Sequence, residues 1–290
     1  MNDSSLQFEY PPIRWEWGPA QVRRYALAIG APWSTLDDND LTLVTGSAPT
    51  VFPTFAVLLA DGHSLRHHPL PGIQYRKLDV IYAGHELEVF GALPSEGQGI
   101  TRTRLVDVGD VSPGALVIRE SISTNELGTV VARNVVTSII RGASIGEPAR
   151  RPSRSSAEPS VFDIEVEIPT LPQQALLYAQ TGDDNPLHLN PSAARAAGFD
   201  RPILHGLCSY GMIAHAVMRE CARARWTALR RVTARFTSPV VPGELLVARA
   251  TRRGNEIEFA AWVRGESGAE RKVLSHGEIE LVDEVSTATI

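Results

Sequence analysis

The stretch YAQTGDDNPLHLNPSAARAAGFDRPILHGLCSYG, from Tyr178 to Gly211, decides how this chain is interpreted. It begins with an acidic, turn-rich segment in which Asp183 and His188 are five residues apart, with Asn185 and Pro186 between them. Proline disfavours a helix that continues through the preceding residue, so we expect an extended loop that turns both side chains into one space. A carboxylate beside an imidazole can serve as an acid/base pair near neutral pH.

The same stretch ends in an apolar helix, which we expect to open at His205-Gly206 and to reach about Cys221. This helix is apolar all round and rich in small residues, which predicts that it is buried. Gly206 would present an N–H group that has no partner inside the helix and lies in its positive dipole potential. Such a donor suits a carbonyl oxygen that gains negative charge. The alternatives are a capping role for the acids and a packing role for Gly206.

The spacing of this stretch recurs in the first half of the chain. Tyr178 precedes His205 by 27 residues, and Tyr25 precedes Phe52 by the same interval. In each half a short helix, an apolar helix and then β-branched alternating runs are expected in that order. The pattern predicts an α+β fold of two units, residues 1–145 and 161–290, with a Pro-, Ser- and Arg-rich linker at 146–160. Joining the two sheets edge to edge would remove two exposed edges.

The composition is that of an ordinary globular protein, with 43% hydrophobic and 21% charged residues. A net charge of −5 does not favour a nucleic-acid surface. The acidic N-terminus does not resemble a signal peptide, and no apolar run is long enough to predict a membrane span. Cys208 and Cys221 form neither a disulfide framework nor a zinc-binding spacing, which fits a reducing cytoplasm.

Several common catalytic motifs are missing from the sequence. No G-x-S-x-G elbow predicts serine hydrolysis, and no G-x-G-x-x-G follows a predicted strand. The pair His67-His68 lacks further ligands at metal-binding spacing. We therefore expect neither a metal site nor a bound cofactor.

Two motifs in the opening stretch resemble those of a known family. Y-A-x-T-G-D-x-N-P-L-H-x-N and G-F-x-R-P-I-L-H-G-L-C-x-x-G are similar to segments of the (R)-specific enoyl-CoA hydratases, the hydratase 2 branch of the MaoC-like dehydratases. The resemblance covers nearly the whole chain and implies a double hot-dog fold, in which a curved sheet wraps a long helix in each half. It implies that Asp183 and His188 activate water and handle the proton, that Asn185 orders the loop and that the Gly206 N–H holds a thioester carbonyl.

The resemblance also implies which other residues contact the substrate. The first half carries no D-x-N-P-x-H motif and would make room for the acyl tail. In the stretch PLPGIQYRKLD, Pro71 stands where the family usually has histidine. Asp184 is otherwise a surface or capping acid. The full set of expected substrate contacts is Asp184, Pro186, Leu187, Gly72, Arg235 and Thr237.

The reaction implied is reversible addition of water to a trans-2-enoyl-CoA, which gives a (3R)-3-hydroxyacyl-CoA without a cofactor. The partner would be an acyl-CoA thioester, with no nucleic acid and no membrane, and a homodimer is compatible with the prediction. Two alternatives within the same fold are a dehydratase for carrier-protein-bound chains and a thioesterase. A third alternative is a non-catalytic acyl-CoA-binding protein.

Overall fold

Ten antiparallel strands form one continuous sheet in the computed structural model, which describes residues 8–61, 69–70, 73–149 and 161–282. The strand order is β1-β3-β4-β5-β2-β7-β10-β9-β8-β6. The first half of the chain supplies β1 (Ile13–Trp17), β2 (Val80–Val89), β3 (Gly97–Val111), β4 (Gly114–Asn125) and β5 (Val130–Arg141). The second half supplies β6 (Ile164–Pro169), β7 (Leu229–Phe236), β8 (Leu245–Arg253), β9 (Glu256–Arg264) and β10 (Glu270–Leu281).

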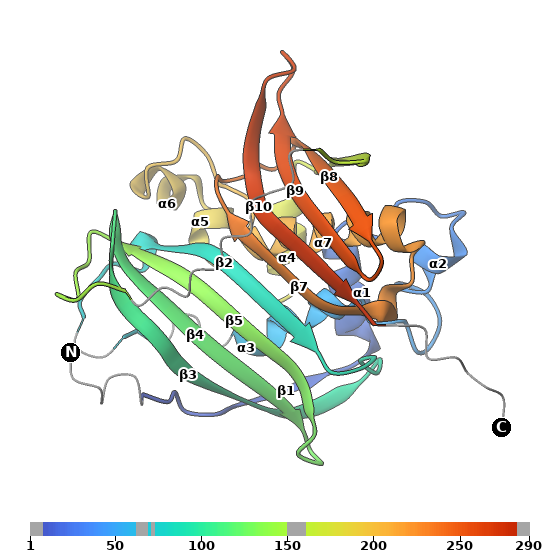
Figure 1. Ribbon diagram of the computed structural model, residues 1–290, viewed down its shortest axis with the longest axis horizontal. Helices are drawn as coiled ribbons and strands as arrows, with labels where there is room; N and C mark the ends of the chain where they lie inside the picture. The colour runs from blue at the N-terminus through green and yellow to red at the C-terminus, as the bar shows by residue number, and fades with distance from the viewer. Residues whose placement is uncertain (1–7, 62–68, 71–72, 150–160, 283–290) are drawn as a thin grey trace.

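The two halves meet where β2 pairs with β7, which places the teal strand of the first half beside the orange strand of the second in Figure 1. In this pair Gly84 lies opposite Arg235 and Glu86 lies opposite Thr233. The expected edge-to-edge joining is therefore confirmed. Each half hides one edge of its sheet by hydrogen bonding to the other half.

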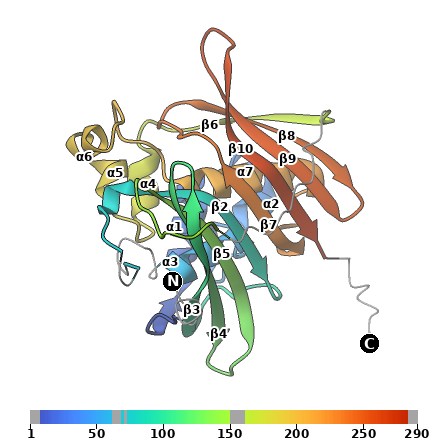
Figure 2. The ribbon, with the colours of Figure 1, turned by 60° about the vertical axis from the view of Figure 1, so that its left-hand side comes forward.

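Helix α7 (Gly206–Ala222) is the main helix of the second half, and 14 of its 17 residues are buried. It packs across β6, β7 and β8 on the inner face of the sheet (Figure 2). The other helical segments are α1 (Pro19–Ala28), α2 (Asp38–Leu41), η2 (Pro53–Val57), α3 (Leu58–Asp61), η3 (Lys77–Asp79), α4 (Gln174–Ala179), α5 (Pro186–Leu189), α6 (Pro191–Ala196) and η4 (Trp226–Ala228). The buried position predicted for the apolar helix after His205 is confirmed.

The first-half counterpart of α7 differs from the long α-helix that we expected. Its described part is the 3₁₀ segment η2 followed by the single α-helical turn of α3. Short 3₁₀ pieces are common at the start of helices, where hydrogen bonding is incomplete. The five residues of η2 are all buried, so this segment still fills the core of the first half.

The 27-residue interval corresponds to structurally equivalent positions. Tyr25 on α1 and Tyr178 on α4 are both buried, with ring centroids 6.3 Å apart. Phe52 is the N-cap residue of η2, and His205 is the N-cap residue of α7. The predicted repeat is thus confirmed at both of its ends.

The segment before the linker is attached to the sheet. The carboxylate of Asp110 accepts hydrogen bonds from the backbone N–H groups of Ile145 and Gly146, and Pro148 forms a β-bridge with Asp110. The expected linker at 146–160 is therefore ordered as far as Ala149, and its remainder lies outside the described residues. The reason is that the half-buried carboxylate of Asp110, near the end of β3, satisfies the backbone donors there.

Both cysteines are buried and form no disulfide. Burial raises the pKa of Cys208 far above its usual value and raises that of Cys221 to about 11. Both therefore serve as small apolar core residues. Within the described ranges, no helix has the length and apolar character needed to cross a bilayer.

Candidate active site

The loop between α4 and α5 is shaped by its own side chains. The Asp183 Oδ1 atom accepts a hydrogen bond from the Asn185 backbone N–H at 3.2 Å. Asn185 is in turn the N-cap of α5, and its Oδ1 accepts from the Leu187 N–H at 3.2 Å. The prediction of an extended loop is therefore wrong after Asn185, where α5 begins at Pro186. Proline is well tolerated at the first position of a helix.

His188 lies on α5 and is buried, with 7% of its surface exposed. Its Nδ1 lies 2.8 Å from the carbonyl oxygen of Ile203. Because a carbonyl can only accept, Nδ1 carries the proton of the neutral ring, and Nε2 carries the lone pair. This geometry leaves His188 as a base with a fixed tautomer.

His205 is a further member of the site that the sequence reasoning missed. Its ring centroid lies 3.9 Å from that of His188, and its Nε2–H donates to the Asp183 carbonyl oxygen at 3.0 Å. His205 therefore ties the acidic loop to the start of α7. Its signals in the sequence were its place at the end of the 27-residue interval and its place in the motif G-F-x-R-P-I-L-H-G-L-C-x-x-G.

The Asp183 carboxylate and the two imidazoles could hold a metal ion. One ligand atom from each of Asp183, His188 and His205 lies within 4.8 Å of the others. Carboxylate and imidazole are ligands that zinc accepts. The absence of a metal was predicted from the spacing of other histidines, His67 and His68. This absence stays a prediction.

Gly206 is the first residue of α7, and no described residue accepts a hydrogen bond from its N–H. A Cβ atom at this position would lie 3.2 Å from the Cε1 atom of Phe236, closer than most real contacts. Because glycine has no side chain, the first turn of α7 and a ligand can both lie close to the phenyl ring of Phe236. The helix dipole adds positive potential at the same point.

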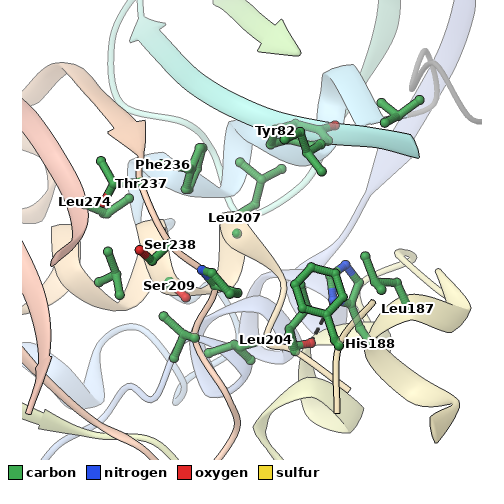
Figure 3. A pocket seen from close by; sticks show the side chains of 18 of the residues that line it. Tyr82, Leu187, His188, Leu204, Leu207, Ser209, Phe236, Thr237, Ser238 and Leu274 are labelled. Carbon is green, nitrogen blue, oxygen red and sulfur yellow. Dashed lines mark hydrogen bonds between the residues drawn. The ribbon is translucent and has the colours of Figure 1, made fainter. Parts of the chain in front are cut away.

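Asp183, His188 and Gly206 all line one cavity of about 250 Å³. Figure 3 shows His188 and Leu187 on one side of it and Tyr82, from the first half of the chain, on the other. The apolar part of the lining comprises Val80, Ile81, Leu187, Phe199, Ile203, Leu204, Leu207, Phe236, Pro239, Val240, Val273 and Leu274. An acid/base pair and a helix N-terminus therefore face an apolar pocket built by both halves.

The expected substrate contacts divide into two groups. Leu187 and Thr237 line the cavity, and the Thr237 hydroxyl also donates to the Lys272 carbonyl at 2.8 Å. Asp184, Pro186 and Arg235 are exposed and do not line it. Gly72 lies outside the described residues.

Arg141, on β5, lines the cavity but was not predicted from the sequence. Its Nη2 donates to the carbonyl oxygens of Leu78 at 3.1 Å and Ala197 at 3.4 Å. The bond to Ala197 connects the first-half sheet to the α6 region of the second half, and the bond to Leu78 stays within the first half. Nothing in the local sequence around residue 141 marks such a long-range role.

Family models match both halves of the chain. Residues 155–272 match the MaoC like domain, and residues 15–142 match the MFE-2 hydratase 2 N-terminal domain. The two matches follow the division of strands between the halves.

Similar proteins cover almost the whole chain. The enoyl-CoA hydratase ChsH3 of Mycobacterium tuberculosis is 35% identical over 88% of this chain and 90% of its own length. A peroxisomal enoyl-CoA hydratase 2 of Arabidopsis thaliana is 31% identical, over 91% of each chain.

Solved structures show the same fold. A MaoC-like dehydratase from Phytophthora capsici superposes with a TM-score of 0.81 at 25% identity, covering 97% of this chain and 99% of that chain. A Mycobacterium tuberculosis protein described as a double hotdog fold has a TM-score of 0.60 at 13% identity, over 94% and 96% of the two chains. The α+β double hot-dog fold is therefore confirmed, and this chain belongs to the hydratase 2 branch of the MaoC-like family.

Proposed function

We propose that this protein catalyses reversible hydration of trans-2-enoyl-CoA thioesters to (3R)-3-hydroxyacyl-CoA. The observation that carries the proposal is one apolar cavity in which Asp183 and His188 lie with the N-terminus of α7. Hydration needs an acid/base pair at Cβ and Cα and an electrophilic site at the carbonyl. The cavity supplies both kinds of group.

The thioester carbonyl would accept a hydrogen bond from the Gly206 N–H. Negative charge moves onto this oxygen as water adds to Cβ, and a helix N-terminus stabilises that charge. A buried, largely apolar site strengthens the interaction because water screens it less.

His188 and Asp183 would hold the water at Cβ. The lone pair on Nε2 of His188, fixed by the bond from Nδ1 to Ile203, can accept a proton from this water. The water oxygen forms the bond to Cβ as the double-bond electrons move towards the carbonyl, and the Asp183/His188 pair returns the proton to Cα, so H and OH are both added to the double bond. The reverse sequence gives dehydration of the (3R)-hydroxyacyl thioester.

Substitution of either acid/base residue tests the proposal. We expect Asp183→Asn and His188→Gln each to lower kcat for crotonyl-CoA hydration by about 10²- to 10⁴-fold, because each removes a proton-transfer group. The assay follows loss of the enoyl absorbance, with thermal unfolding to check the fold. Asp38→Asn, at an exposed position on α2 outside the cavity, is the matched control. Near wild-type rates in either folded active-site variant would reject the assignment.

The alternatives within the fold give different products from the same assay. A thioesterase would release free thiol, and a carrier-protein dehydratase would prefer carrier-protein substrates. A non-catalytic binding protein would bind acyl-CoA without any loss of enoyl absorbance. Chiral analysis of the hydrated product separates the (3R) from the (3S) outcome.

We also propose a cytoplasmic location and an acyl-CoA substrate. The buried free cysteines suit a reducing compartment. The Arabidopsis relative is peroxisomal by name, so localisation of a tagged chain is the test. Sedimentation would decide between a monomer and a homodimer.

A further inference from the structure

The inner face of the first-half sheet carries a buried arginine, Arg119 on β4. Only 3% of its surface is exposed. Arg119 lies opposite Val136 on β5, and Val136 lies opposite His85 on β2. These residues form one row across the strands, on the face that packs against the helices.

No described side chain neutralises the charge of Arg119. Within the described part of the chain no ion pair involves its guanidinium, and its Nε has no hydrogen-bond partner. The neighbouring Glu120 faces the opposite side of β4 and is paired with Arg104 and Arg133. A guanidinium stays charged in proteins, and a buried charge without a partner is costly.

The groups around Arg119 do not supply the missing charge. His85 donates from Nε2 to the Oδ1 atom of Asn134 at 2.9 Å, and burial lowers the pKa of His85 to about 4, so the ring is neutral. Ser121 shares a hydrogen bond with Thr103. Asp107, on β3, is a buried acid, but it makes no ion pair with Arg119.

Arg119 lines a second, small cavity of about 10 Å³, roughly the space of one water molecule. Its other lining residues include His85, Ser121, Tyr82 and Leu207. Tyr82 and Leu207 also line the active-site cavity, so the two cavities adjoin across these side chains.

The path from the reacting end to Arg119 crosses the junction of the two halves. Phe236, beside Gly206, lies on β7, and β7 is separated from β4 by β2 and β5. Three strand intervals correspond to roughly 14 Å. An acyl tail whose thioester is held at Gly206 would have to pass Tyr82 and Leu207 to reach Arg119.

We propose that Arg119 binds a carboxylate at the far end of the acyl chain, so that the protein favours ω-carboxylated enoyl thioesters. This inference rests on the proposed function for the position of the thioester. A carboxylate would neutralise the guanidinium and accept bidentate hydrogen bonds from it. The tail oxygens would enter at the small cavity and displace Tyr82 or Leu207 outward. Arg119 is then a specificity-determining residue at the opposite end of the substrate from Asp183 and His188.

Binding of saturated analogues tests this without requiring catalysis. Calorimetric Kd values would be compared for an acyl-CoA with a terminal methyl group and for its ω-carboxyl and ω-carboxamide counterparts of equal length, over graded lengths. At one length we expect the carboxylate to bind about 10- to 100-fold more tightly than the methyl ligand, as for a hydrogen bond to a charged group. The preference should disappear in Arg119→Met and be partly retained in Arg119→Lys.

Arg102→Met, at an exposed position on β3 outside both cavities, is the matched control and should keep the preference. Equal binding of the three ligands to the wild type, or a preference that survives Arg119→Met, would reject the proposal. Equal binding of carboxylate and carboxamide would show that no anion is recognised.

The thermal stability of Arg119→Met distinguishes the proposed ligand role from an alternative in which Asp107 neutralises Arg119 inside the protein. An unpaired buried charge can be replaced by methionine without loss, so the melting temperature should stay the same or rise. A clear fall would mean that Asp107 depends on Arg119 and would count against a ligand role. Failure of the enoyl thioesters to be hydrated would reject the proposed function alone, because the Kd comparison does not depend on turnover.

Discussion

His188 and His205 each use one ring N–H on a main-chain carbonyl, that of Ile203 and that of Asp183 respectively. Such bonds fix both the tautomer and the orientation of an imidazole. The two rings also lie against each other, with centroids 3.9 Å apart. Backbone atoms of the loop and of the segment before α7 therefore help to set the positions of the acid and the base.

Gly206→Ala tests how closely the substrate must approach α7. The substitution keeps the backbone N–H but places a methyl group 3.2 Å from the Cε1 atom of Phe236. We expect kcat/KM for the enoyl-CoA to fall by about 10- to 100-fold, because the carbonyl is held away from its donor. Combining it with Phe236→Leu should recover part of the loss, and Phe236→Leu alone is the control. A fully active Gly206→Ala variant would show that the carbonyl does not bind there.

At this scale the sequence predicted the residues that act within one short segment. Asp183, Asn185, His188 and Gly206 lie within 24 positions of each other, and their types alone indicate an acid/base pair and a helix start. Arg119, Arg141 and Tyr82 were not predicted, because their roles depend on which strands pair in the folded sheet. Arg235 and Asp184 do not line the cavity, and their contact with the substrate stays a prediction, since side-chain direction on a strand or loop is set by tertiary contacts.

At the scale of elements, α7 owes its buried position to small residues at the points where other segments cross it. Gly211 faces α1, where a Cβ atom would lie 2.7 Å from the Cγ2 atom of Ile29 and 2.9 Å from the Tyr25 hydroxyl oxygen. Nearby, the Cys208 thiol contacts the Ala28 carbonyl oxygen at 3.4 Å, so a second small residue allows the same approach. Helix α1 of the first half thus packs directly on the main helix of the second.

Gly211→Ala should destabilise the fold although alanine is the better helix former. Tyr25 and Ile29 are both buried and cannot move aside freely, so we expect the free energy of unfolding to fall by about 1–3 kcal/mol. Urea unfolding measures this change. Gly265→Ala, in an exposed turn with its nearest atom 3.6 Å from the added Cβ, should change stability by less than about 0.5 kcal/mol. Equal effects at the two positions would contradict the packing argument.

Elements with a strong pattern were predicted well, and those with a weak pattern were not. The apolar residues of α1 and α7 repeat at helical spacing, and α7 was expected close to its observed bounds. Helix α5 was missed because it is a single turn, too short to show any periodicity, and it is held by the Asn185 cap. The mixed character of η2 and α3 likewise depends on how the segment packs into the first-half core.

At the scale of the whole molecule, the two halves are joined by charges as well as by backbone hydrogen bonds. Glu86 on β2 accepts from Arg133 on β5 at 2.6 Å and from Arg231 on β7 at 2.9 Å. Arg230 on β7 makes a similar contact with Glu88 at 2.9 Å. The expectation of two similar units from the 27-residue repeat was correct, but a repeat cannot reveal which side chains connect its copies.

Glu86→Gln tests whether this junction stabilises the whole fold. Burial raises the pKa of Glu86, but hydrogen bonds and charge interactions with Arg231 and Arg133 outweigh it, and the pKa is lowered below its usual 4.5. The ionised form is therefore favoured by folding, and its contribution is present above pH 4.5 and lost as the pH falls further. At neutral pH we expect the variant to lose about 1–3 kcal/mol of unfolding free energy, as for hydrogen bonds to a charged group.

The pH dependence of the unfolding free energy distinguishes an ion pair that couples the two halves from a surface ion pair that does not. Wild-type stability should fall more steeply than that of Glu86→Gln below pH 4.5, so the two curves converge in acid. Because β2 and β7 belong to one sheet, loss of the pair should lower a single transition seen equally by tryptophan fluorescence and by far-ultraviolet circular dichroism. Two separate transitions, with only one of them shifted, would mean that the halves unfold independently and that the junction does not couple them.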